Sequence, residues 1–207
     1  MRIYAIVFLL FINVLYARAQ KFGGNPSSVK FRQINTDTAR IIFPEGFDST
    51  AMRVAAYIHA IPAAQQRLNS SIGGDIKKIS IVLQPTGTVS NAYVGLGPWR
   101  SEFFLMPPQD AFELGAQNWP YDLSVHEFRH VQQFSNFNRG WSKTFKTLFG
   151  EYGQSLANAA AIPDWFFEGD AVYNETLLSG QGRGRLPFFF NDYKSIFLSG
   201  RQYSYMQ

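Results

Sequence analysis

The chain has 207 residues, of which 46% are hydrophobic and 16% charged, and its 20 Phe, 10 Tyr and 4 Trp exclude a disordered protein. Its net charge is only +4, and the basic residues are scattered, which argues against nucleic-acid binding. The absence of cysteine excludes disulfides, a thiolate nucleophile and a cysteine-ligated metal, so a metal site would have to use histidines and carboxylates.

The N-terminus has the pattern of a secretory signal peptide. Arg2 precedes an apolar run from Ile3 to Tyr16, and Ala17-Arg18-Ala19 is an A-x-A cleavage site. An uncleaved anchor is the alternative, but a spanning helix needs about 20 residues and only 15 separate the two arginines. We therefore predict cleavage after residues 1–19, no membrane span afterwards, and a secreted, periplasmic or cell-surface location.

Strands are expected to dominate the first half of the mature chain. Residues 20–36 are polar and predict a leader, and residues 37–207 form the predicted domain. A helix is predicted from Asp48 or Ser49, as N-cap, to about Leu68, with a kink or break at Pro62. Apolar runs bounded by Gly or Pro predict four strands; these are Ala39–Phe43, Ile79–Leu83, Ala92–Val94 and Ser101–Met106.

Helices are expected to follow the strands. Asp164 is the predicted N-cap of the last one, which covers Trp165–Leu178. The stretch 179–185 is expected to be a solvated loop, and the alternative is that Gly182–Arg185 binds an acidic substrate or a C-terminal carboxylate. Strands first and helices second indicate the α+β class rather than a doubly wound parallel sheet. The earlier helical segments are Tyr121–Phe134, Trp141–Phe149 and Glu151–Ala161, the last two separated by Gly150.

The main candidate for chemistry is the motif His126-Glu127-Phe128-Arg129-His130. Histidines at i and i+4 project from one face of a helix, close enough to bind one metal ion, and neutral imidazole suits zinc. Glu127 is adjacent to the first ligand, so it can act as general base toward a metal-bound water. Two surface histidines on an amphipathic helix are the alternative, but H-E-x-x-H rarely arises by chance.

A catalytic zinc site normally has three protein ligands, so one more must come from elsewhere in the chain. Glu168 is the best candidate, because it follows three large aromatic residues at a helix start, where a buried carboxylate would need a partner. Its alternative role is stabilisation of the helix start. His59 is expected to be a core residue, on an apolar face with Met52, Ala55 and Ala56.

The sequence H-E-F-R-H followed by P-D-W-F-F-E-G-D-A resembles the gluzincin metallopeptidases, in particular their peptidase MA-like branch, whose motifs are HExxH and W-x-x-E-G-x-A. The resemblance is specific over residues 122–176. It implies one Zn²⁺ ion per chain on His126, His130 and Glu168, with Glu127 as the catalytic base. The spacer of 37 residues, Val131–Phe167, exceeds that of thermolysin, and the predicted helices over 141–161 account for the extra length.

The zincin-like fold implied by this resemblance has a small mixed sheet, followed by the active-site helices. An edge strand above the zinc binds the substrate in extended form. The predicted strand at Ser101 is in the expected place, which makes Ser101, Glu102, Phe103 and Phe104 the candidate substrate-binding residues. Family members usually continue into a helical C-terminal subdomain, so an incomplete subdomain and a further domain beyond Gln207 are expected. The residue that stabilises the oxyanion stays unassigned; the tyrosines considered are Tyr173, Tyr193, Tyr203 and Tyr205.

The leading interpretation is a secreted zinc metallopeptidase that acts on peptides or proteins. An endopeptidase is favoured, because the G-x-M-E-N motif of aminopeptidases is absent and the corresponding region reads Gly95-Leu96-Gly97-Pro98-Trp99. Two alternatives stay open. One is a catalytically inactive zincin-like binding module of a larger envelope or secreted protein, and the other is a zinc hydrolase of non-peptide bonds.

Overall fold

The computed structural model describes residues 25–201, apart from the side chains of Ala111 and Glu113. The chain divides into two compact units, Met1–Lys30 and Phe31–Gln207, and the fold below is that of the second. The predicted signal peptide, residues 1–19, lies outside the described residues.

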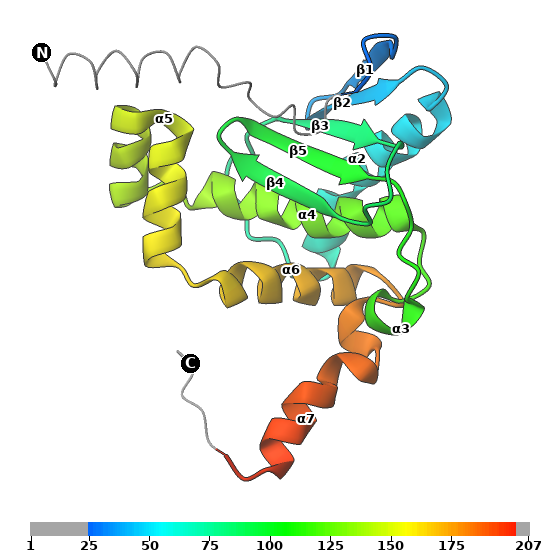
Figure 1. Ribbon diagram of the computed structural model, residues 1–207. Helices are drawn as coiled ribbons and strands as arrows, with labels where there is room; N and C mark the ends of the chain where they lie inside the picture. Colours follow the sequence, from blue (N-terminus) through cyan, green and yellow to red (C-terminus); the bar gives the residue numbers. More distant parts are fainter. Residues whose placement is uncertain (1–24, 202–207) are drawn as a thin grey trace, which may run out of the picture. The chain divides into compact units, whose positions relative to one another are not determined.

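A five-stranded mixed sheet forms one layer of the second unit (Figure 1). Its spatial order is β1-β2-β3-β5-β4, in which β2, β3 and β5 are parallel and the two outer strands are antiparallel to their neighbours. The α+β class is therefore confirmed. The strands are β1 (Phe31–Asn35), β2 (Ala39–Pro44), β3 (Ile79–Gln84), β4 (Ala92–Leu96) and β5 (Trp99–Phe104).

One face of the sheet carries the hydrophobic core. In β3 the buried side chains alternate with partly exposed ones, as the two-residue period of a strand requires when only one face is covered. Two helices, α2 (Asp48–Arg67) and α4 (Trp119–Asn136), contribute to the same core. Figure 1 shows both helices running beneath the strands.

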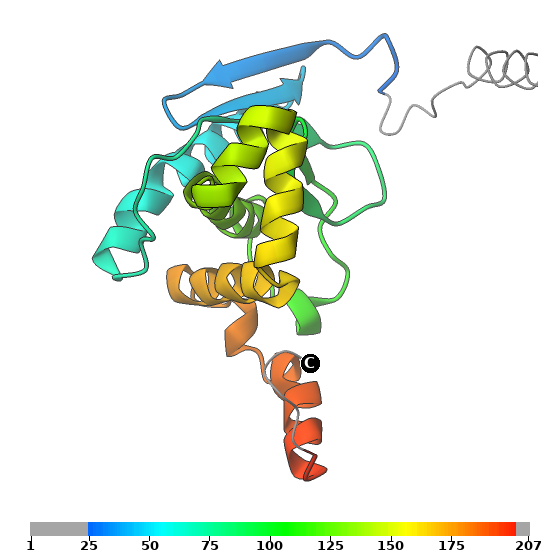
Figure 2. The same ribbon diagram turned by 90° about the vertical axis from the view of Figure 1, so that its left-hand side faces the viewer.

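Three further helices follow α4 in the chain. The first, α5 (Gly140–Ala161), is interrupted at Gly150, whose φ of 67° and ψ of −154° are non-helical, and this confirms the division predicted there. The second, α6 (Asp164–Leu178), packs against α4 on the side away from the sheet, and α7 (Asn191–Leu198) lies beyond it in both views (Figures 1 and 2). The short elements are α3 (Ala111–Leu114), η1 (Arg183–Arg185) and η2 (Phe188–Phe190).

Several local predictions were wrong. Residues 31–35, placed in the polar leader, form β1, because backbone pairing with β2 stabilises an edge strand that has few buried side chains. The predicted caps Asp48 and Asp164 are the first residues of their helices, where they interact with the helix dipole. Helix α2 also runs through Pro62 without a break.

The buried face of α2 differs from the predicted one. Met52 is 58% exposed, and Ala56 and His59 are also exposed. The buried stripe is instead displaced around the helix and consists of Ala51, Val54, Ala55, Ile58, Ile61 and Gln65. His59 is therefore not a core residue, and it lies outside the group of potential metal ligands described below.

Phe103 allows a test of the core. Its side chain is fully buried, so we expect Phe103→Ala to reduce the free energy of unfolding by about 3–5 kcal/mol, because a cavity replaces the ring. Urea denaturation followed by circular dichroism measures this loss. Phe112, which is 77% exposed, provides the matched control, and a similar loss from Phe112→Ala would contradict the assignment of the core.

Candidate metal centre

Helix α4 presents both histidines of the motif toward a cavity. The His126 and His130 side chains are only 12% and 10% exposed, while Val125 and Phe128 on other faces of the helix belong to the core. The helix is thus held between the sheet and α6, which fixes the direction of both imidazoles. As predicted, the two residues lie one turn apart on a common face.

Helix α6 brings Glu168 to the two histidines. The guanidinium of Arg129 in α4 binds Asp170 in α6 through two hydrogen bonds of 2.7 and 2.8 Å. Gln133 adds two bonds from its amide nitrogen, one to Asp170 and one to the Phe167 carbonyl oxygen. These bonds join the helices on either side of Glu168 and so set the position of its carboxylate.

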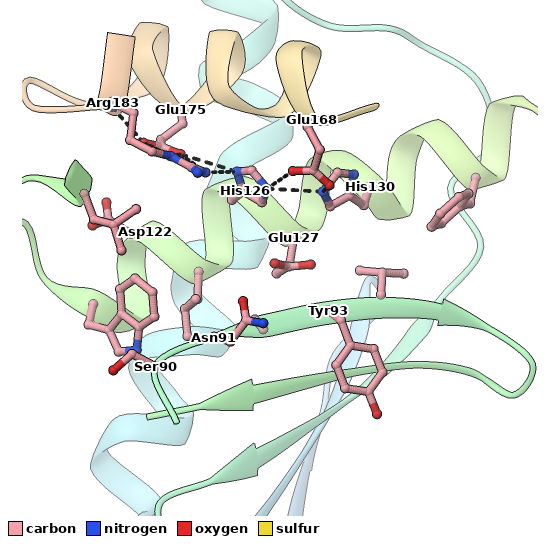
Figure 3. Close-up of a pocket in the computed structure, with 16 residues that line it drawn as sticks. Ser90, Asn91, Tyr93, Asp122, His126, Glu127, His130, Glu168, Glu175 and Arg183 are labelled. Carbon is pink, nitrogen blue, oxygen red and sulfur yellow. Dashed lines mark hydrogen bonds and ion pairs between the residues drawn. The ribbon is translucent and has the colours of Figure 1, made fainter. Parts of the chain in front are cut away.

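The three side chains form a group that could hold one metal ion (Figure 3). The Nε2 atoms of His126 and His130 are 3.2 Å apart. Glu168 Oε2 lies 3.3 Å from His126 Nε2, and Glu168 Oε1 lies 3.5 Å from His130 Nε2. Ligand atoms at ordinary distances from a tetrahedral zinc ion would be about 3.4 Å apart, so the spacing fits such an ion.

The expected burial of Glu168 is wrong, although its position is right. Its side chain is 63% exposed, so the carboxylate is open to solvent on one side. Of the two small residues that follow in α6, Ala171 is fully buried, whereas a Cβ on Gly169 would meet nothing within 4 Å. A ligand at the mouth of the site is compatible with an open coordination position for substrate.

Second contacts orient each imidazole. His130 Nδ1 lies 2.8 Å from Gln133 Oε1, which can only accept, so the Nε2 lone pair is directed at the site. His126 Nδ1 lies 3.3 Å from Glu175 Oε2 and 2.7 Å from Arg183 Nη2. It can donate to the carboxylate or accept from the guanidinium, but metal binding through Nε2 requires donation to Glu175.

Arg183 is a site residue that the sequence did not reveal. The loop after α6 returns to the cavity, and the Arg183 backbone N–H donates to Glu175 Oε1 at 2.8 Å. Its Nη2 donates to Glu175 Oε2 at 2.9 Å, so this arginine is not a solvated loop residue. Only the fold shows this, because no local sequence pattern indicates that Arg183 folds back onto Glu175, eight residues earlier.

The electrostatics of the site favour positive charge. Burial opposes ionisation of Glu175, but hydrogen bonds from His126 and Arg183 prevail and lower its pKa to about 2. Burial would also lower the pKa of His126, yet the bonds to Glu168 and Glu175 raise that pKa to about 9. Protons and a metal cation compete for the same ligand atoms, so the imidazole lone pairs and carboxylates that hold protons here could also hold a metal ion.

Glu127 has the environment of a reactive carboxyl group. Its side chain is buried, Oε2 has no hydrogen-bond partner among the described residues, and burial raises the pKa to about 7. Figure 3 shows it between the histidines and β4, facing into the cavity. A carboxylate left without a donor is costly, so its ionised form gains from a cation or a donor group placed in this space.

The cavity has a volume of about 380 Å³ and lies between α4, α6 and β4. Ala92, Tyr93 and Val94 of β4 line it, and β4 is one of the two edge strands of the sheet. The prediction that β5 is the edge strand is therefore wrong, because β5 is hydrogen-bonded on both sides, to β3 and β4.

The four residues predicted to bind substrate do not line the cavity. Ser101 and Phe103 are fully buried within the sheet. The Glu102 carboxylate accepts a hydrogen bond of 2.6 Å from the Tyr93 hydroxyl, and Phe104 pairs with β3 through its backbone. Their positions follow from the strand order, which residue patterns alone did not predict.

The residue that stabilises an oxyanion stays unassigned. Tyr173 and Tyr193 are 60% and 68% exposed, and neither lines the cavity. Tyr203 and Tyr205 lie outside the described residues. Tyr93 does line the cavity, but its hydroxyl is bound to Glu102 and points away from the histidines (Figure 3).

Comparisons with protein-family models, curated proteins and solved structures found no match to this chain. Among the described residues, none of the helices combines the length and hydrophobicity needed to cross a membrane.

The ion pair between α4 and α6 can be tested by removing the arginine. We expect Arg129→Met to reduce the free energy of unfolding by about 3 kcal/mol, because Asp170 would lose its charged partner in a largely buried setting. Metal affinity should fall as well, since Glu168 lies in the same turn of α6 as Asp170. The control is Arg32→Met, which breaks two exposed pairs, with Glu45 and Asp48, and should cost less than about 1 kcal/mol. Equal losses from both variants would contradict the role of the pair.

Glu175 is expected to orient His126 for metal binding. We expect Glu175→Gln to weaken metal binding about 10- to 100-fold, because the neutral amide holds the Nδ1 proton less firmly. Competition with a chromophoric chelator measures the affinity. Glu151→Gln is the matched control, because Glu151 also accepts a hydrogen bond from a backbone N–H, that of Trp99, and also pairs with a cation, Lys77. Unchanged affinity in Glu175→Gln would rule out this orienting role.

Proposed function

We propose that this protein is a zinc-dependent metallopeptidase. The observation that carries the proposal is the convergence of His126, His130 and Glu168, with their ligand atoms at the spacing of a tetrahedral ion. Two imidazoles and one carboxylate form a donor set that suits zinc and leaves one position open for catalysis. Zinc bound there would lower the pKa of a coordinated water and polarise the scissile carbonyl group.

Glu127 is the proposed proton carrier. It follows His126 directly in α4, so it faces the same cavity without entering the ligand group. A pKa of about 7, raised by burial, suits a group that takes a proton and later returns it to a leaving amine near neutral pH. Its buried Oε2 has no hydrogen-bond partner among the described residues, so this oxygen is not committed to another side chain.

The proposed substrate is a peptide in extended form along β4. The outer edge of β4 has no strand partner within the described part of the chain, and three of its residues line the cavity. A peptide could therefore add to this edge by backbone hydrogen bonding, which would place its carbonyl groups opposite α4. This replaces the role that the sequence analysis gave to β5.

The resemblance to gluzincins supports the same assignment. Its two motifs supply His126, Glu127, His130 and Glu168, the four residues that meet in the cavity. Export through the predicted signal peptide would place the enzyme outside the cytoplasm, where substrates would be exogenous or envelope proteins. This location is part of the proposal.

The proposal is tested by metal analysis and digestion of an unbiased peptide library. Wild-type protein should contain about one zinc per chain and cleave peptides, and Glu127→Gln should retain zinc but lose about 100- to 10,000-fold in kcat, because proton transfer is removed. His126→Ala should lose both zinc and cleavage. Mass spectrometry identifies the cleaved bonds.

His59→Ala is the matched control, because this exposed histidine lies outside the ligand group and should affect neither zinc content nor cleavage. Undiminished cleavage by Glu127→Gln would refute the proposed mechanism. Zinc binding without any peptide cleavage would refute the peptidase assignment and favour a binding module.

A further inference from the structure

A second buried carboxylate lines the cavity and is not used by the proposed chemistry. Asp122 is 8% exposed, and its Oδ1 has no hydrogen-bond partner among the described residues. It precedes His126 by one helical turn, roughly 6 Å along the axis, and projects from the same face of α4. Figure 3 shows it at the end of the cavity farthest from His130.

Among the described residues, no cation forms an ion pair with Asp122. The guanidinium of Arg183 donates to Glu175 through Nη2 and Nε, and the Arg183 backbone N–H donates to the same carboxylate. Burial, and after it the negative charge of Glu175, raises the pKa of Asp122 to about 7, although the charges of Arg183 and His126 act in the opposite direction. The ionised carboxylate is thus disfavoured until a positive group enters the cavity.

The surroundings of Asp122 suit an amine with an apolar stem. Leu114, Trp119 and Leu123 give the cavity that holds Asp122 hydrophobic walls, and the polar residues Ser90 and Asn91 also line it. Long cationic side chains bury their methylene groups along such surfaces while the charged end meets a carboxylate. A hydrated metal ion would instead need several oxygen ligands, and Asp122 offers only one carboxylate.

We propose that Asp122 forms a subsite for a cationic amine of the substrate, an inference that rests on the proposed peptidase function. The ammonium group donates hydrogen bonds to the Asp122 carboxylate and neutralises its charge, one helical turn from His126. The amine belongs either to a lysine side chain near the scissile bond or to the free N-terminus of a peptide that is cleaved close to its end. Asp122 is thus a specificity-determining residue, and Glu127 keeps the proton transfer.

The test measures binding and cleavage separately. Zinc-loaded Glu127→Gln protein is titrated by calorimetry with two peptides that have blocked ends and differ only in one lysine or its Nε-acetylated form. A second pair lacks basic side chains and differs only in a free or acetylated N-terminus. We expect one of the two pairs to show about 10- to 100-fold tighter binding of the charged peptide, because a hydrogen bond to a charged group is lost on acetylation.

Adding Asp122→Asn should reduce this preference to less than about threefold. Asp48→Asn is the matched control, since it removes an exposed acid from the first turn of α2 and should leave the preference intact. Zinc content confirms that each variant is folded. If Asp122→Asn does not fold, Asp122→Ser replaces it. Equal binding of the charged and acetylated peptides by the protein that retains Asp122 would overturn the inference without any variant.

The outcomes separate the two proposals. Loss of the lysine preference in Asp122→Asn assigns the subsite to a side chain, and loss of the N-terminal preference assigns it to the α-amine. Equal binding of charged and acetylated peptides, or a preference that survives Asp122→Asn, overturns the inference. If protein with an intact active site binds charged peptides preferentially but cleaves none, only the peptidase function is refuted. If it cleaves peptides without a charge preference, only the subsite is refuted.

Discussion

The candidate metal centre depends on the ion pair between Arg129 and Asp170. Arg129 is nearly buried and comes from the same helical turn as the two histidines, while Asp170 lies two residues after Glu168. Two charges removed from water on facing helices are stable only when they stay paired. The pair therefore restricts how α6 can slide or rotate on α4, and with it the approach of Glu168.

Polar contacts of a second kind extend this restriction to α2. Three buried amides, Gln65 of α2, Gln132 of α4 and Asn174 of α6, bind one another through bonds of 2.6 to 2.9 Å. Such a network is favourable only when its members meet in one arrangement, because a buried amide without a partner is costly. The helices are thus fixed by direction-dependent bonds, in addition to the apolar core that joins α2 and α4 to the sheet.

Negative charge in the cavity is unevenly neutralised. Glu175 has Arg183 as its partner, whereas the carboxylates of Glu127 and Asp122 each have an oxygen without a hydrogen-bond donor in the described structure. The histidines and Glu168 line the same cavity and form the candidate metal centre. An excess of carboxylates over cations in a partly enclosed cavity attracts positive groups, which links the proposed zinc ion and the proposed amine subsite to one electrostatic cause.

Local patterns predicted the elements better than their assembly. The apolar run Ile79–Leu83 and the glycine at position 150 correctly predicted a strand and a helix break, because both depend on adjacent residues. The buried face of α2 was misplaced, since Met52 and Ala55 are apolar on either interpretation and only the neighbouring sheet decides which is covered. The edge strand was misplaced for a similar reason: pairing order is a property of the whole sheet.

The sequence by itself determined the pair of histidines and the adjacent glutamate, because an i and i+4 spacing on a helix places two side chains together regardless of the rest of the chain. It also singled out Glu168, through a motif rather than through any calculation of distance. Only the tertiary structure decided that Glu168 reaches the histidines, that β4 borders the cavity, and that Arg183 and Asp122 face it. These positions depend on contacts between segments far apart in the chain, and such contacts follow from the packing of the helices and the sheet as a whole.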